Sequence, residues 1–201
     1  MQLLAVARRA VDGSLTMLGD VAQATGPVTY RRWEELEPYL PADVGVRIEE
    51  LRHAYRVPAE IMELALPLLA WIAPDVEPPI AYRQGGEPPR IVRVRADELL
   101  PAALREAAAL TELDGLLAVI APRSLAAASP HGEAFDEVSV PVLTPREAKG
   151  LEFDHVVVVE PAGIADEGGE QGLRELYVAL TRPTRTLVVV HARPLPEELG
   201  V

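Results

Sequence analysis

The sequence predicts an α/β fold in which a mostly parallel sheet is covered by helices on both faces. Two observations carry this prediction. Segments with helical spacing alternate with apolar, strand-like segments through most of the chain. Several of the apolar segments, such as "GLLAVIAP" and "HVVVVEP", are continuous runs of aliphatic residues. Such runs are typical of strands that are buried on both faces, as strands are in a parallel sheet.

The elements predicted for the first 90 residues are short. We expect a helix end at 1–11, an apolar strand at 14–20, a loop, a short helix in "RRWEELEPYL", an alternating strand at 44–51 and a helix at 57–72. Pro58 suits the first turn of that last helix. Residues 73–90 are rich in proline and contain Gly85-Gly86, so they should form an extended connection.

The remaining residues alternate more regularly. We expect strands at 90–95, 115–122, 139–144, 155–161 and 185–192, a helix in "ELLPAALREAAALTEL", a short helix and loop after residue 123, and a further helix within 168–184. The carboxylates at 160, 166, 167 and 170 are expected in an exposed acidic loop. A domain boundary is expected between residues 27 and 44, which divides the chain into 1–35 and 36–201.

Composition excludes several classes of function. The formal charge of −12 argues against nucleic-acid binding through bulk positive charge, so any such contact must be local. The chain has no cysteine, which excludes disulfides and Cys-based metal sites and agrees with a cytoplasmic location. No apolar run is long enough to span a membrane, so no membrane partner is expected.

Four segments occur in a fixed order: "LTMLGDVAQ", "IEELRHAYRVPAEI", "LTPREAKGLEFDHVVVVEP" and "ELYVALTRPTRTLVVV". Each alone is a weak signal, because Gly-Asp is usually a turn and an arginine that ends a helix usually complements the helix dipole. Together the series resembles the later motifs of UvrD/Rep-like superfamily-one DNA helicases, and "GDVAQATG" looks most like their helicase IV (HelD-like) branch. The resemblance implies the second, C-terminal RecA-like motor domain, with residues 1–35 as the trailing segment of the first.

The resemblance also implies roles for individual residues around ATP and Mg²⁺. Arg56 and Arg182 match the two arginine fingers, which stabilise charge during phosphoryl transfer. Gln23 matches the glutamine that senses the γ-phosphate, Tyr55 the ring that stacks on adenine, and Glu152 a glutamate near the ribose and phosphates. These residues form the expected ATP site, with Arg56, Arg182 and Gln23 as its catalytic members.

The expected nucleic-acid-binding residues are Thr144, Arg146, Lys149 and Thr181. Thr144 and Arg146 match positions that contact the DNA backbone, and Thr181 lies beside the second finger. Lys149 is the only lysine in the chain, and we expect either a phosphate contact or a salt bridge for it. Ligands of parallel sheets bind at the carboxyl ends of strands, and the expected site residues are placed there.

Essential parts of an ATP site are missing from the sequence. It contains no G-x-x-x-x-G-K-[ST] segment, and Lys149 precedes its glycine, so it cannot be a P-loop lysine. The strand ending in Asp-Glu that would hold magnesium is missing too, so no metal site is expected here. We expect both parts in an N-terminal RecA-like domain of the same parent protein, which makes this chain truncated and inactive alone.

Three functions remain open. The leading hypothesis is the motor portion of an ATP-dependent helicase or translocase acting on single-stranded or partly duplex DNA. The second is an ATP-driven remodelling factor that displaces a protein such as RNA polymerase from nucleic acid. Ala24, Thr25 and Gly26 stand where many relatives carry base-stacking aromatics, which favours this alternative unless Tyr30 or Trp33 substitutes. The third is a fragment that serves only as a binding module.

Overall fold

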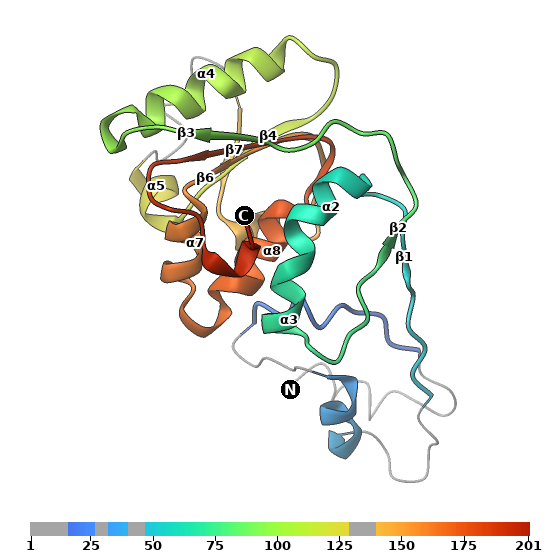
Figure 1. Ribbon diagram of the computed structural model, residues 1–201. Helices are drawn as coiled ribbons and strands as arrows, with labels where there is room; N and C mark the ends of the chain where they lie inside the picture. Colours follow the sequence, from blue (N-terminus) through green and yellow to red (C-terminus); the bar gives the residue numbers. More distant parts are fainter. Residues whose placement is uncertain (1–15, 27–31, 40–46, 129–139) are drawn as a thin grey trace.

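A five-stranded parallel sheet forms the centre of the molecule. The computed structural model describes residues 16–26, 32–39, 47–128 and 140–201. The strands of the sheet are β3 (Arg90–Arg93), β4 (Leu117–Ile120), β5 (Val142–Leu143), β6 (Phe153–Val159) and β7 (Pro183–His191). Their spatial order is β3-β7-β6-β4-β5, and every neighbouring pair is parallel (Figure 1).

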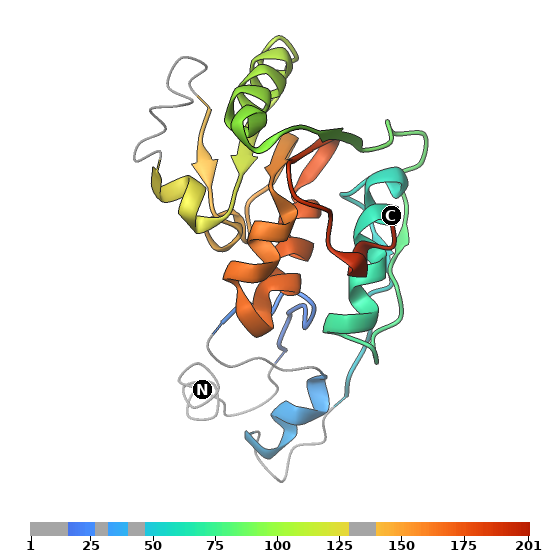
Figure 2. The same cartoon turned by 60° about the vertical axis from the view of Figure 1, so that its left-hand side comes forward.

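Helices cover both faces of this sheet. The long helix α4 (Leu99–Thr111) packs on one face. The opposite face carries α2 (Ala59–Ala65), α3 (Leu69–Ile72), α6 (Pro145–Ala148), α7 (Pro161–Glu167) and α8 (Gly172–Leu180). In Figure 2 the green α4 and the orange α7 and α8 lie on opposite sides of the strands. The fold class predicted from the sequence is confirmed.

The valine run in β6 shows why the sheet sits between two cores. Val156 and Val158 face the core under α2 and α8, whereas Val157 and Val159 face the core under α4. Successive side chains of a strand point to opposite faces, so a strand covered on both sides needs apolar residues at every position. All four valines are buried. Each buried aliphatic side chain contributes roughly 1.5–3 kcal/mol relative to an exposed one.

The remaining elements are short. A two-stranded parallel sheet of β1 (His53–Ala54) and β2 (Ile80–Ala81) lies beside α2. The other helical segments are α5 (Arg123–Ala128) and the 3₁₀ turns η1 (Trp33–Tyr39), η2 (Leu66–Leu68), η3 (Ala96–Glu98), η6 (Gly169–Gln171) and η7 (Glu197–Leu199). No helix in the described ranges has both the length and the apolarity to cross a bilayer.

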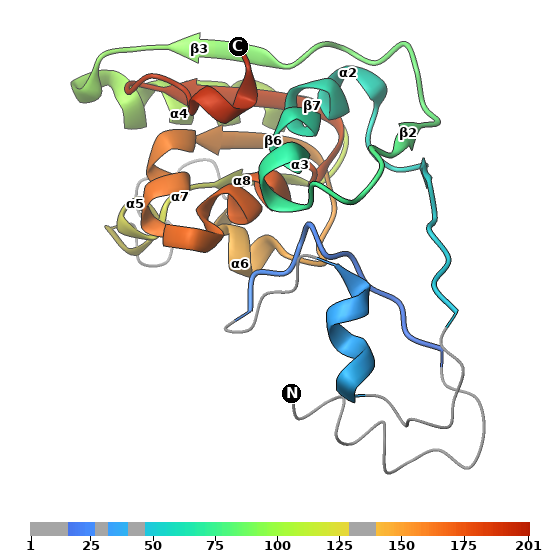
Figure 3. The ribbon, with the colours of Figure 1, turned by 60° about the horizontal axis from the view of Figure 1, so that its bottom comes forward.

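Residues 16–26 form an irregular segment that packs on α8. Val21 and Ala22 are buried in the same core as the helix. Two side chains in and next to α8 form hydrogen bonds with the segment. Arg174 donates to the carbonyl of Val21, and Gln171 donates to the carbonyl of Gly26. Figure 3 shows this blue segment running beside α8.

Several predicted elements differ from the structure. Residues 16–20 and 47–52 form no strand, because apolar or alternating sequence makes a strand only where a neighbour can pair with it. The predicted helix at 57–72 is interrupted by η2 at Pro67, which lacks the N–H that an α-helix needs. The predicted helix end at 1–11 lies outside the described residues.

The expected acidic loop after β6 is wrong in two respects. Residues 161–167 form α7, with Pro161 at its first position. Glu160 is buried, in a left-handed backbone conformation (φ 51°), and its Oε2 accepts hydrogen bonds from the N–H groups of Ala192 and Arg193. It therefore joins the ends of β6 and β7.

Candidate functional site

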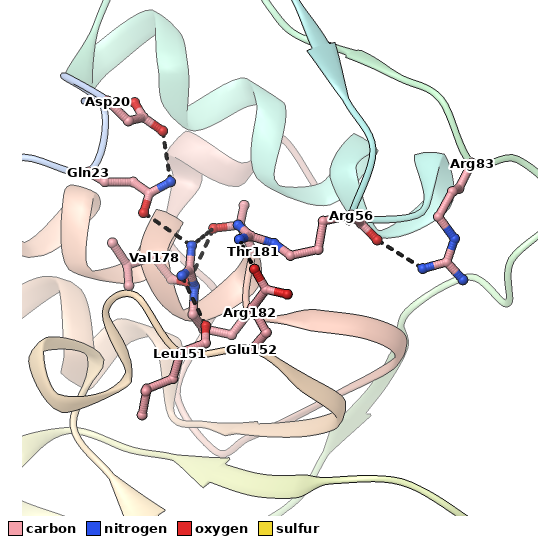
Figure 4. Close-up of polar contacts among 9 residues, drawn as sticks. All are labelled: Asp20, Gln23, Arg56, Arg83, Leu151, Glu152, Val178, Thr181 and Arg182. Atoms are coloured by element: carbon pink, nitrogen blue, oxygen red, sulfur yellow. Dashed lines mark hydrogen bonds and ion pairs between the residues drawn. The ribbon is translucent and has the colours of Figure 1, made fainter. Parts of the chain in front are cut away.

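Arg182 is the centre of the candidate site. It follows α8 directly and precedes β7, and only 1% of its surface is exposed. Its Nε donates to the carbonyl of Val178 (3.0 Å), and its Nη1 to that of Leu151 (3.2 Å). Its Nη2 donates to Oε1 of Gln23 (3.1 Å) and to Oγ1 of Thr181 (3.2 Å). The guanidinium thus donates hydrogen bonds to three parts of the chain: the end of α8, the loop before β6, and the segment that contains Gln23 (Figure 4).

None of these four acceptors is a carboxylate. Burial, with the nearby charge of Arg56 as a second cause, lowers the pKa of Arg182 to about 10. A cation buried among neutral acceptors destabilises the fold unless a further group compensates it. Strongly perturbed ionisable groups of this kind concentrate at functional sites. The arrangement is therefore suited to receive an anion.

Gln23 reaches Arg182 because a turn fixes its amide. Oδ1 of Asp20 accepts the N–H of Ala22 (2.9 Å), and Oδ2 accepts Nε2 of Gln23 (2.7 Å). With its nitrogen held by Asp20, the amide must present its oxygen to the arginine. The "GDVAQ" segment thus forms an aspartate-capped turn that presents Gln23 to Arg182.

Arg56 and Glu152 form an ion pair at the same place. Nη1 of Arg56 lies 2.6 Å from Oε1 of Glu152, and both side chains are partly exposed. Nε of Arg56 is buried and finds no hydrogen-bond acceptor among the described residues. Arg56, Glu152 and Asp20 all act electrostatically on Arg182, which places the four charges in one cluster.

Tyr55 lies next to this cluster with its ring largely outside the core. The side chain is 64% exposed and contacts the ring of Tyr82, with centroids 5.1 Å apart and planes at 42°. The centroid of the His53 ring is 6.1 Å from that of Tyr55. A packed structural tyrosine would be buried, so this ring is free to stack on a planar ligand.

The site lies at a different end of the sheet from the one that the sequence predicts. Glu152 directly precedes β6 and Arg182 directly precedes β7, so both stand at the amino ends of parallel strands. In the same five-stranded sheet Thr144 directly follows β5 and stands at a carboxyl end, and Tyr55 directly follows β1 of the small sheet. The carboxyl-end rule describes ligands held by loops after strands. Here the two residues reach the site from segments that enter strands.

The residues expected at DNA lie around α6 and α8. Thr144 caps α6 through a capping box, in which its Oγ1 accepts the N–H of Glu147 and the Glu147 carboxylate accepts the N–H of Thr144. Arg146 pairs with Glu175, whose carboxylate is buried. Thr181 is buried, and its hydroxyl donates to the carbonyl of Tyr177.

Lys149 ends α6 and is exposed, next to Gly150 in a positive-φ conformation (83°). Among the described residues no carboxylate forms an ion pair with it. Its ammonium group is therefore available to an external anion. The expected salt bridge within the loop is not among the ion pairs of the described ranges.

The structure thus brings Gln23, Tyr55, Arg56, Glu152 and Arg182 together, although they come from four distant parts of the sequence. Thr144, Arg146 and Lys149 lie on a separate segment. Sequence reasoning missed Arg83, whose guanidinium donates to the backbone carbonyl of Arg56. In the part of the chain that the structure describes, no three His, Asp or Glu side chains gather into a possible metal site.

Trp33 does not lie free as a base-stacking ring would. It is partly buried against the core below α8, and its ring packs so closely on Gly19 that a Cβ there would lie 2.8 Å from it. This packing favours a role for Trp33 in the core and not in base stacking. Tyr30 lies outside the described residues.

Comparison with known proteins gives a match to one family model, matches among solved structures, and one negative result. Residues 139–190 match the family model of the UvrD-like helicase C-terminal domain. That range contains Thr144, Arg146, Lys149, Glu152 and Arg182, but neither Gln23 nor the Tyr55-Arg56 pair. No curated protein matches the chain.

A solved structure shares the fold. The chain is similar to the C-terminal domain of a possible DNA helicase from Lactobacillus plantarum WCFS1, with a TM-score of 0.54 and 21% identity. The match covers 73% of this chain and 92% of that one. The segment from β5 to β7 thus resembles UvrD-like helicase C-terminal domains in sequence, and 73% of the chain resembles the C-terminal domain of a possible DNA helicase in fold.

Proposed function

We propose that this chain is the C-terminal motor portion of an ATP-dependent DNA helicase or translocase, of the UvrD-like type and of its helicase IV-like branch. One observation carries the proposal: the buried guanidinium of Arg182, which is held by neutral acceptors beside Arg56 and Gln23. A group with this geometry and this electrostatic cost is what an arginine finger requires.

The residues present fit a nucleoside triphosphate. Within the described ranges, Arg56 has a buried Nε without an acceptor, and the buried charge of Arg182 donates only to neutral groups, so both can bind phosphate oxygens. Tyr55 offers an exposed ring for the base. Glu152 holds Arg56 in place and can exchange this contact when an anion arrives. These residues bind and orient the nucleotide and stabilise the charge that phosphoryl transfer develops.

The proposal assigns the phosphate-binding loop and the Mg²⁺ ligands to an N-terminal RecA-like domain of the parent protein. Residues 1–35 belong to the end of that domain and residues 36–201 to the second. Gln23 then lies on the first domain and Arg182 on the second, so their hydrogen bond joins the two. Opening or closing between the domains would make or break it, which couples hydrolysis to movement.

DNA is the proposed polymer substrate. Lys149 supplies an exposed cation next to Thr144 and Arg146, in a chain whose net charge is otherwise unfavourable for binding a polyanion. Thr181 acts through Arg182, because its hydroxyl is buried and accepts a hydrogen bond from that guanidinium. The segment from Thr144 to Glu152 connects the two sites.

The test is DNA-stimulated ATP hydrolysis by the protein that contains both motor domains. Arg56→Ala and Arg182→Ala should each lower kcat by roughly three orders of magnitude or more, while nucleotide binding is largely kept. Arg93→Ala, an exposed arginine on β3, is the matched control and should hydrolyse ATP normally. Near-normal turnover by both site variants would refute the proposed function.

A further inference from the structure

The tripeptide Ala-Tyr-Arg occurs twice, at residues 54–56 and 81–83, and the fold places the two copies side by side. β1 and β2 are parallel, with His53 opposite Ile80 and Ala54 opposite Ala81. The N–H of Tyr82 donates to the carbonyl of Ala54 (2.9 Å). Along the same register, Tyr82 accompanies Tyr55 and Arg83 accompanies Arg56. Only the first copy belongs to the site described above.

We propose that Tyr82 and Arg83 are positioning residues, which hold Tyr55 and Arg56 in the orientation that the nucleotide requires. This proposal rests on the proposed function, and it adds two residues that would hold the nucleotide-binding side chains in position. Neither residue needs to touch the nucleotide.

Arg83 connects the two arginine-bearing segments. Its Nη1 donates to the carbonyl of Arg56 (3.0 Å) and to the carbonyl of Thr184 (2.7 Å). Thr184 follows Arg182 by two residues, so a single charged donor ties the backbone at one finger to the backbone just beyond the other. Figure 4 shows Arg83 approaching the carbonyl of Arg56 from outside the cluster. Hydrogen bonds from charged donors are stronger than neutral ones, which makes this bridge an effective clamp.

Arg83 is itself fixed to the start of α2. The N–H of Ala59 donates to the carbonyl of Arg83 (2.9 Å), and Oε1 of Glu60 accepts the N–H of Gly85 (2.8 Å). Gly86 packs against Pro58 so closely that a Cβ there would lie 2.8 Å from the proline ring. The loop after β2 is therefore docked on the first turn of the helix that follows Arg56.

Tyr82 restricts the ring of Tyr55. The only ring contacts among the described residues are Tyr55 with Tyr82 and Tyr55 with His53. Both tyrosines are mostly exposed, so no core packing would otherwise fix their rings. Tilted aromatic pairs at this centroid distance attract each other. Tyr82 thus limits the orientations of Tyr55, while the Tyr55 side chain stays mostly exposed and accessible to a base.

Steady-state ATP hydrolysis by the protein with both motor domains distinguishes the role of Arg83 at Arg56 from the role of Tyr82 at Tyr55. Arg83→Gln should lower kcat about 10- to 100-fold with a smaller change in KM, since a misplacement of about 1 Å at a catalytic group has an effect of that size. Arg83→Lys should recover part of the loss. Tyr82→Ala should raise KM for ATP about two- to tenfold, and Tyr82→Phe should not. The controls are Arg93→Ala and Trp71→Ala, which changes an equally exposed aromatic residue (65%) on α3.

Amide hydrogen exchange on this 201-residue chain gives a readout that does not depend on hydrolysis. Arg83→Gln should speed exchange in residues 56–62 relative to wild type and to Arg93→Ala. If Arg83→Gln matches Arg93→Ala in both kcat and exchange, while Arg56→Ala abolishes turnover, the positioning role is overturned and the proposed function stands. If Arg56→Ala and Arg182→Ala leave turnover intact, the proposed function fails, and exchange alone then decides whether Arg83 holds the Arg56 backbone.

Discussion

Replacing Arg182 by methionine should abolish ATP hydrolysis with little loss of stability. The lowered pKa of Arg182 means that folding disfavours its charged form by about 3 kcal/mol, which the uncharged side chain recovers. The substitution leaves the carbonyl of Leu151 and the amide oxygen of Gln23 without this donor, at a cost of about 1–3 kcal/mol each. The carbonyl of Val178 keeps a donor in the backbone N–H of Thr181. The two effects nearly offset each other.

We therefore expect the free energy of unfolding to change by less than about 3 kcal/mol, measured by urea denaturation. Leu180→Ala, at the last position of α8 and fully buried, is the comparison and should cost about 2–5 kcal/mol. If Arg182→Met destabilises the chain more than Leu180→Ala does, the guanidinium is mainly a structural clamp and the reasoning is refuted. Turnover within a few-fold of wild type would also refute it.

The same variant should change the alkaline stability profile. Burial raises the pKa of Tyr177 to about 12, so the folded state keeps a proton that the unfolded state loses, and stability falls between pH 10 and 12. Arg182 acts in the opposite sense, because its folded pKa is lowered and stability rises above pH 10 as the folded state releases the proton. Of these two effects, Arg182→Met keeps only that of Tyr177, so its stability should fall more steeply than that of wild type over this range.

Three further predictions concern the surrounding residues. Glu152→Gln should change the free energy of unfolding by less than about 1 kcal/mol, because the ion pair of Glu152 with Arg56 is partly exposed. It should nevertheless change KM for ATP in turnover assays. An unchanged KM would show that Glu152 is not part of the nucleotide site. Thr144→Ala should destabilise the chain by about 1 kcal/mol in denaturant titration through loss of the α6 cap, and a neutral result would mean that the cap contributes nothing. Lys149→Ala should leave ATPase activity unchanged. In a plot of the logarithm of the DNA-binding constant against the logarithm of salt concentration, it should reduce the steepness by about 1, which corresponds to one lost phosphate contact. An unaltered slope would show that this lysine does not contact DNA.

The central strands and α8 could be predicted because their patterns are local. A strand buried on both faces must be apolar at every position, and the valines of β6 satisfy this without reference to any neighbour. The alternating strand predicted at 44–51 is not formed over its described residues 47–51, because pairing depends on a partner that local sequence does not specify. The helix α7 was missed because seven residues with two acidic side chains near their end resemble a loop as much as a helix.

In the candidate site too, local sequence could not specify the contacts between distant segments. The order of the motifs predicted Gln23, Arg56 and Arg182 as site residues, but not that Arg182 is buried or that the cluster lies at the amino ends of β6 and β7. The support from Arg83 could not be foreseen either. The repeated tripeptide was visible in the sequence, but only the parallel register of β1 and β2 gives it a meaning.

The central claim is that these residues form one half of a shared ATP site, and the most direct test is hydrolysis by this chain alone. We predict no turnover above background for the 201-residue chain, with or without DNA, and Arg182-dependent turnover when a motor domain that carries a phosphate-binding loop is joined to it. Robust hydrolysis by the isolated chain would contradict the account.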